Sequence, residues 1–200
     1  MDFFSTSASR HLLSVDRSWP IILMIGLGSV AMALVSIASV PGTIGWLGIG
    51  LAELMLAIAV IDWRHFIIPD RLNAAAFVLG LAHAWLQNPE DILVTLTSAL
   101  ARGAVLAIAF WALRVTYERI RGREGLGFGD VKLAGVAGVW LGWLMLPLAV
   151  ELAAVSALAF YGLRQALVRK PMSATSRLPF GGFLAIAIWL TWILENTSPT

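Results

Sequence analysis

The chain has 200 residues, of which 59% are hydrophobic and only 13% are charged, with a formal net charge of +2. A soluble domain carries about twice that charged share, and one of this length could not bury so much apolar surface in a single core. The composition therefore argues against an ordinary soluble enzyme and indicates an integral membrane protein. The chain has no cysteine, which excludes disulfides, thiolate metal sites and a cysteine nucleophile. We expect no metal and no cofactor.

Seven apolar runs are long enough, or nearly so, to cross a bilayer core of about 30 Å as helices. They follow a polar segment, residues 1–19, and Pro147 separates the fifth run from the sixth, so a tight turn is expected there. We predict one all-α, polytopic membrane domain. The predicted helices are at residues 20–40, 44–62, 72–87, 92–117, 131–147, 148–168 and 180–195.

The basic residues give these helices an orientation. Lys and Arg are enriched in cytoplasmic loops of membrane proteins. With the N-terminus in the cytoplasm, every Lys and Arg except Arg102 falls in the N-terminal segment or near the second, fourth or sixth loop. All of these segments then lie on the cytoplasmic side, and shifting the count by one helix destroys the pattern. We predict about seven membrane-spanning helices, with the N-terminus inside and the C-terminus outside.

Arg102 lies deep in the fourth predicted span, where a charge is costly unless it is paired or hydrated. Glu151, in the sixth predicted span, lies at a similar height when residues are counted from the cytoplasmic ends at about 1.5 Å per residue. One hypothesis is that the two side chains pair. The alternative is that Arg102 extends to the outer face of the membrane.

Three segments break the apolar background: IDWRHFIIPD at 61–70, GLGFGDVKL at 125–133 and LPFGGF at 178–183. All three lie at predicted cytoplasmic ends of helices, so segments far apart in the sequence meet at one face. The proline that follows the first apolar stretch forces a break in the chain. This break is expected to hold Ile67 and Ile68 as a short apolar patch at the membrane interface.

The first two segments each carry an aspartate next to a helix end. Asp62 closes the second predicted helix and Asp130 opens the fifth. Either residue alone is more often a helix cap or a solvated side chain. Gly127 and Gly129, however, leave the backbone before Asp130 open to close approach.

Two carboxylates held close together cannot easily both ionise, so one keeps its proton at neutral pH. The ionised carboxylate can then take a proton from water, and the protonated one can polarise a peptide carbonyl. This is the chemistry of an aspartic protease, and it requires neither a metal nor a thiol. The two groups titrate as a coupled pair.

The segments IDWRHFIIPDRLN, GLGFGDVKLAG and LPFGGFLA, in this order among transmembrane helices, resemble the type IV prepilin peptidase family of GxGD membrane aspartic proteases. The resemblance covers residues 44–195. It leaves residues 1–19 as a cytoplasmic N-terminal segment and residues 20–43 as an additional transmembrane helix and turn.

The resemblance implies roles for individual residues. Asp62 and Asp130 match the two catalytic aspartates of the family, and Asp70 is the rival for the first position. Asp70 is otherwise expected to cap the next helix or to pair with Arg71. The remaining matches, as residues that bind substrate or shape the site, are Gly127, Gly129, Lys132, Pro69, Asp70, Pro179, Phe180 and Gly181.

The resemblance also implies a substrate and a location. The substrate would be a prepilin or pseudopilin with a short basic leader and an apolar N-terminal helix, cut at the cytoplasmic face of a bacterial plasma membrane. Bifunctional members carry an extra domain with two CxxC pairs that accompanies N-methylation. Because this chain has no cysteine, the resemblance is to the short, peptidase-only members, such as those that serve tight-adherence pili. No nucleic-acid partner is expected, and the sequence leaves the oligomeric state open.

Two other classes of function remain open from the sequence. An ion-coupled membrane transporter could use the intramembrane charged residues, although the chain shows no symmetric halves. A non-enzymatic assembly protein of a secretion apparatus would need no chemistry. Both leave the three polar segments unexplained.

Overall fold

A computed structural model describes residues 19–123, 125–168 and 179–197. Within these ranges the chain forms seven α-helices and no strand, which confirms the all-α prediction. The helices are α1 (Trp19–Ser39), α2 (Thr43–His65), α3 (Asp70–Gln87), α4 (Ile92–Arg121), α5 (Phe128–Trp140), α6 (Met145–Val168) and α7 (Phe180–Thr197).

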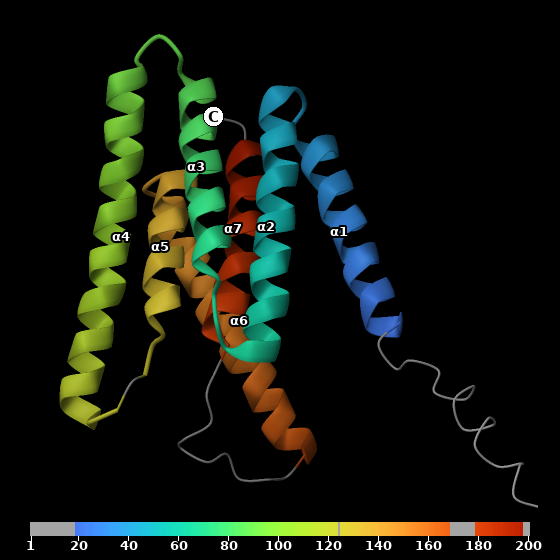
Figure 1. The fold of residues 1–200 in the computed structure, drawn as a ribbon, viewed down its shortest axis with the longest axis vertical. Helices are drawn as coiled ribbons and strands as arrows, with labels where there is room; N and C mark the ends of the chain where they lie inside the picture. The colour runs from blue at the N-terminus through green and yellow to red at the C-terminus, as the bar shows by residue number, and fades with distance from the viewer. Residues whose placement is uncertain (1–18, 124, 169–178, 198–200) are drawn as a thin grey trace, which may run out of the picture.

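The seven helices form one upright bundle, with α1 and α4 at opposite edges (Figure 1). α5 and α7 are the most buried helices and pack against each other. Around them, α3 and α4 pack on α5, and α2 and α6 pack on α7. α1 lies outermost and packs mainly on α2. The core therefore surrounds the two helices that follow the second and third polar segments of the sequence.

Five of the helices are long and apolar enough to cross a membrane: α1, α2, α4, α6 and α7. α3 and α5 are the other two, and the 13 residues of α5 extend only about 20 Å at 1.5 Å per residue. Since α5 is nearly enclosed by its neighbours, it can lie within the bundle without crossing the bilayer alone. The presence of seven helices is confirmed, whereas seven complete spans remain a prediction.

Two predicted helix limits are wrong around α5. The structure begins this helix at Phe128 and ends it at Trp140, rather than using residues 131–147. The expected turn at Pro147 lies earlier, between α5 and α6, because Pro147 falls in the first turn of α6. A proline is tolerated there, since the first N–H groups of a helix have no partner within the helix.

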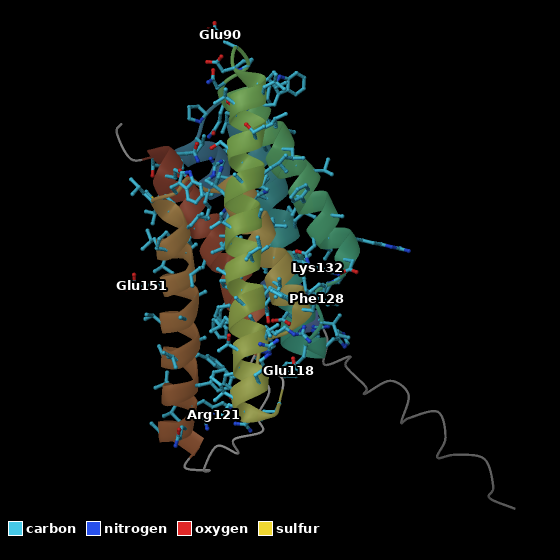
Figure 2. All side chains as sticks on the ribbon, turned by 90° about the vertical axis from the view of Figure 1, so that its left-hand side faces the viewer. Glu90, Glu118, Arg121, Phe128, Lys132 and Glu151 are labelled. Atoms are coloured by element: carbon cyan, nitrogen blue, oxygen red, sulfur yellow. The ribbon has the colours of Figure 1, made fainter. Side chains whose placement is uncertain are left out.

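The pairing of Arg102 with Glu151 is also wrong. The Arg102 guanidinium instead donates to the Gly138 carbonyl oxygen at 3.2 Å and to the Ser98 hydroxyl at 2.9 Å. Glu151 is exposed on α6, and Figure 2 shows it on the outer side of that helix, away from α4. The two residues face different surroundings because α6 packs on α7 and not on α4.

The three polar segments share the lower end of the bundle in Figure 1. α2, α4 and α6 end there, and α3, α5 and α7 begin there. The described parts of the predicted basic loops lie at this end, and they include Arg64, Arg71, Arg119, Arg121 and Arg164. The basic residues predicted within 1–18 and 169–178 lie outside the described residues.

Candidate active site

Asp62 lies in the last turn of α2 and is only 5% exposed. The helix stops just below it because Phe66 adopts a left-handed conformation, with φ 55°, while its N–H donates to the Asp62 carbonyl oxygen at 2.9 Å. The Asp62 side chain points inward. Its Oδ2 accepts a hydrogen bond from the Gly182 N–H, in the first turn of α7, at 2.7 Å.

Asp130 lies in the first turn of α5, outside the five helices able to span a membrane, and is 8% exposed. Its Oδ2 accepts a hydrogen bond from the Gly127 N–H at 3.0 Å, and its own N–H donates to the Gly127 carbonyl oxygen at 3.2 Å. These two bonds fold the Gly-Phe-Gly segment back over the helix start. Asp130 therefore caps its helix, as the sequence allowed, but it does so with one carboxylate oxygen only.

The other Asp130 oxygen faces the start of α7. A Cβ added to Gly181 would lie 2.7 Å from Asp130 Oδ1, and one added to Gly182 would lie 3.6 Å from Asp62 Oδ2. The structure thus brings Asp62 and Asp130 together on either side of the Gly181–Gly182 pair. Burial, followed by the Asp62 carboxylate, raises the pKa of Asp130 from 3.8 to about 7, and the Gly127 hydrogen bond only partly opposes this shift.

The loop before α3 inserts Ile68 between the two helix starts. Ile68 is 8% exposed, whereas Ile67 is 62% exposed. Of the two residues expected to form an exposed apolar patch, only Ile67 is therefore on the surface. A Cβ on Gly129 would lie 3.0 Å from the Ile68 Cβ, and one on Gly181 would overlap the Ile68 Cδ1. A glycine is therefore needed at both positions, because Ile68 lies too close for a larger residue. The absence of side chains there allows α5 and α7 to start side by side beneath the carboxylates.

Asp70, the rival for the first catalytic position, lies apart from this pair. It is the first residue of α3, and its Oδ1 is 2.6 Å from Lys132 Nζ, with the Asp70 side chain 74% exposed. Asp70 therefore forms its ion pair with Lys132 and not with Arg71, the partner expected from the sequence. The Lys132 ammonium also lies 5.1 Å from the Phe128 ring centre, and Figure 2 shows both residues toward the lower end of the bundle.

The C-terminal Pro-Phe-Gly segment contributes the start of α7. Pro179 is buried just before the helix, where its fixed φ suits a helix start. The Phe180 ring lies 6.2 Å from the Phe110 ring of α4. Gly181 then provides the close approach to Asp130. Within this segment, the contact with the carboxylates comes from Gly181, whose lack of a side chain allows the close approach.

The sequence did not single out Gly182, although its N–H makes the hydrogen bond to Asp62. The only signal was the adjacent glycine pair, which does not say which carboxylate the second glycine contacts. Over residues 19–123, 125–168 and 179–197, no group of three His, Asp or Glu side chains is placed to hold a metal ion.

Comparisons with known proteins identify relatives of this chain. The chain is 35% identical over 140 residues to the leader peptidase HopD of Salmonella typhimurium, covering 70% of this chain and 87% of that protein. It is 35% identical over 136 residues to a prepilin leader peptidase/N-methyltransferase of Stutzerimonas stutzeri, covering 68% of this chain and 45% of the relative. A similar enzyme of Aeromonas hydrophila is 30% identical over 192 residues, covering 91% of this chain and 63% of the relative.

The chain thus spans about half the length of the Stutzerimonas relative. No solved structure matches it significantly. A sequence model of the type IV leader peptidase family matches residues 49–163, more than half of the chain, and this range contains both Asp62 and Asp130. The protein belongs to the type IV leader peptidase family.

Proposed function

We propose that this protein is a membrane-embedded aspartic endopeptidase that removes the short basic leader from a type IV prepilin or pseudopilin. The observation that carries the proposal is the meeting of two buried carboxylates, Asp62 and Asp130, at the start of α7. Two like charges in an apolar site favour a shared proton, and a shared proton is what an aspartic peptidase uses. The names of the relatives support the same activity.

In this proposal Asp62 is the ionised member and Asp130 the protonated one. The Gly182 N–H, at the N-terminus of an 18-residue helix, favours the anion on Asp62. The raised pKa of Asp130 favours its acid form near neutral pH. A water molecule between the two carboxyl groups would then lie beside one base and one acid.

The reaction would proceed in two balanced steps. In the first step, the water oxygen attacks the carbonyl carbon of the peptide while Asp62 takes a proton from that water. Asp130 gives its proton to the carbonyl oxygen, and the product is a neutral diol. Asp62 then passes its proton to the departing nitrogen as the C–N bond breaks. Asp130 regains a proton from the remaining hydroxyl group, so one water is consumed and the pair returns to its starting state.

We place the site on the cytoplasmic side of a bacterial plasma membrane. The end of the bundle that holds Asp62 and Asp130 also holds Arg64 in the last turn of α2 and Arg119 and Arg121 in the last turn of α4. Basic residues beside membrane helices favour the cytoplasm. A prepilin held by its apolar helix would present its basic leader on the same side. The remaining residues of the polar segments would shape the site: Gly127, Gly129, Lys132, Pro69, Asp70, Pro179, Phe180 and Gly181.

The deciding experiment co-expresses the chain with a type IV prepilin from the same bacterium and follows the mass of the prepilin. Leader removal by the native chain, and its loss with Asp62→Asn or Asp130→Asn at normal membrane levels, is expected. Glu118→Gln is the matched control, because Glu118 is an exposed acid at the same end of the bundle (Figure 2). Asp70→Asn tests the rival position. Unchanged cleavage in both the Asp62 and Asp130 variants would falsify the proposal.

A transporter is less consistent with the contacts of the intramembrane charges. The Glu53 carboxylate accepts hydrogen bonds from the Ser29 hydroxyl of α1 at 2.8 and 2.9 Å, and Arg102 binds the Gly138 carbonyl. Each of these charges is thus engaged in holding one helix to its neighbour, which favours a structural role for both.

A further inference from the structure

A groove of about 390 Å³ lies on the side of the bundle where α2 and α6 both pack against α7. α7 forms its floor, and one pair of residues from each neighbouring helix forms its walls. The lining residues are Ala59 and Trp63 of α2, Leu152 and Ser156 of α6, and Gly182, Phe183, Ile186, Ala187 and Leu190 of α7.

The lower end of this groove adjoins the carboxylate site through a shared residue. Gly182 lines the groove and also donates its N–H to Asp62, while Trp63 directly follows Asp62 in the chain. Trp63 meets Phe160 of α6 with ring centres 5.0 Å apart and Phe183 of α7 at 5.9 Å. These three rings join the helices at the end of the groove nearest the carboxylates.

The lining has the chemistry of a helix-packing surface. Apart from the indole N–H of Trp63, its one polar side chain is Ser156, and the Ser156 hydroxyl already donates to the Ala153 carbonyl oxygen at 3.0 Å. Ala59, Ser156 and Ala187 are small, and small residues allow helix backbones to approach closely in a membrane. The floor from Gly182 to Leu190 is about 12 Å long at 1.5 Å per residue, which corresponds to about two helical turns.

We propose that this groove binds the first two turns of the apolar helix that follows the leader of the substrate. This inference rests on the proposed function and adds the binding surface for the segment of the substrate that remains in the membrane. A helix lying along α7 with its N-terminal end downward would direct the peptide bond just before it past Trp63 to Asp62. Gly182 both lines the groove and donates its N–H to Asp62, so the lower end of the groove lies next to the carboxylate site. This adjacency favours the substrate helix over a lipid acyl chain, which has no reason to end at the carboxylates.

The groove can be tested with two neighbouring positions on α6. Ser156 is exposed and lines the groove, whereas Val155 is 57% exposed and lies outside it. Ser156→Phe should fill the groove from its wall without entering the core, and Val155→Phe adds a similar ring on another face. Cleavage of a full-length prepilin in membranes should fall by about tenfold or more with Ser156→Phe and stay near the native rate with Val155→Phe.

Photo-crosslinking identifies the occupant directly. Leu190→p-benzoylphenylalanine replaces a large, 42% exposed side chain at the upper end of the groove. In an Asp130→Asn background that keeps the prepilin intact, it should crosslink to the prepilin's apolar helix about eight residues from its start, the distance expected from the helical rise. The same photo-reactive residue at Val155 should give no such product. Crosslinks from position 190 to lipid only, or to a second copy of this chain, would overturn the inference.

The outcomes separate this inference from the proposed function. If the native chain never cleaves a prepilin, the proposed function fails. If it cleaves normally and Ser156→Phe has no effect, the peptidase assignment stands and the groove assignment is wrong. Equal losses of cleavage for Ser156→Phe and Val155→Phe, at equal membrane levels, would also overturn the groove assignment. The loss would then not depend on whether the changed residue lines the groove.

Discussion

The lower and upper regions of the bundle both bury polar side chains, but they do so in opposite ways. In the upper region several charged or polar groups meet complementary partners: Arg102 donates to the Gly138 carbonyl oxygen, and Glu195 accepts a hydrogen bond from the Gly142 N–H at 2.9 Å. His83 is only 1% exposed, and its Nε2 accepts a hydrogen bond from the indole N–H of Trp192 at 3.0 Å. These bonds tie α3, α4, α5 and α7 together.

The lower region, by contrast, brings a pair of acids toward each other. Asp62 and Asp130 each accept one backbone N–H, and the Asp62 charge raises the pKa of Asp130. Complementary groups lower the energy of the folded state, whereas two neighbouring acids raise it when both ionise. The comparison teaches that burial of a polar residue does not by itself indicate chemistry. The like-charged pair is the arrangement that stability alone would not favour.

The largest expected effect is on the carboxylates themselves. Asp62→Asn or Asp130→Asn should lower the rate of prepilin cleavage by about 10²–10⁴-fold, the usual worth of a general acid or base. His83→Asn, in the upper region, should retain cleavage per folded molecule. Both rates are measured by mass spectrometry of the prepilin, after normalising to folded protein. Comparable loss of cleavage from the upper and lower variants would remove the distinction between the two regions.

The second test uses the glycines that allow the acids to approach. A Cβ at Gly181 would overlap Ile68 and press on Asp130 Oδ1, whereas the nearest atom to a Cβ at Gly135 is the Ala107 Cβ at 3.6 Å, an ordinary contact. Gly181→Ala should therefore reduce cleavage by about 10²-fold through misplacement of the carboxylate. Gly135→Ala should have little effect. Activity close to native in Gly181→Ala would show that the close approach at α7 is not needed.

The third test is the dependence of cleavage on pH. If Asp130 must be protonated, cleavage should decline as the pH rises through about 7, by up to about tenfold per unit. The profile reports the coupled pair rather than one residue. It is measured as the initial cleavage rate between pH 5 and pH 9 in detergent, with protein integrity checked at each pH. A rate that keeps rising to pH 9 would contradict the assignment of the acid.

The same titration has a consequence for stability. The folded-state pKa of Asp130 lies above its usual value of 3.8, so the folded state binds more protons than the unfolded state between these values. The contribution of Asp130 to stability is therefore fully present below about pH 4 and is lost as the pH rises through about 7. The melting temperature of the native protein should fall over this range, and that of Asp130→Asn should fall less. Identical pH dependence in both proteins would argue against burial of an ionisable Asp130.

The smallest expected effect is on the stability of the upper region. Arg102→Leu removes the donor to the Gly138 carbonyl and should cost about 1–3 kcal/mol, because a buried acceptor is left unpaired. Glu151→Leu should leave the melting temperature nearly unchanged, because Glu151 is exposed on α6. Thermal unfolding in detergent distinguishes the two. An equal destabilisation by both variants would restore the pairing that the structure contradicts.

Local features of the chain determined much of this result. An apolar composition is enough to argue against a soluble core, and apolar runs separated by charged loops or by proline-containing breaks are enough to predict seven helices. The two acids were also identifiable, because Asp62 and Asp130 each lie in a polar segment at a helix end. These features can be recognised from the sequence because each depends only on residues that are close together in the chain.

Only the tertiary structure decided which surfaces meet. It assigned Gly182, and not a residue of the Pro-Phe-Gly segment, as the donor to Asp62, and it separated buried Ile68 from exposed Ile67. It paired Asp70 with Lys132, across two helices, and gave Arg102 a backbone partner. Helical periodicity and charge counting fix the direction and approximate length of each helix but not its rotation or neighbours. Those are set by packing between helices, which no single segment contains.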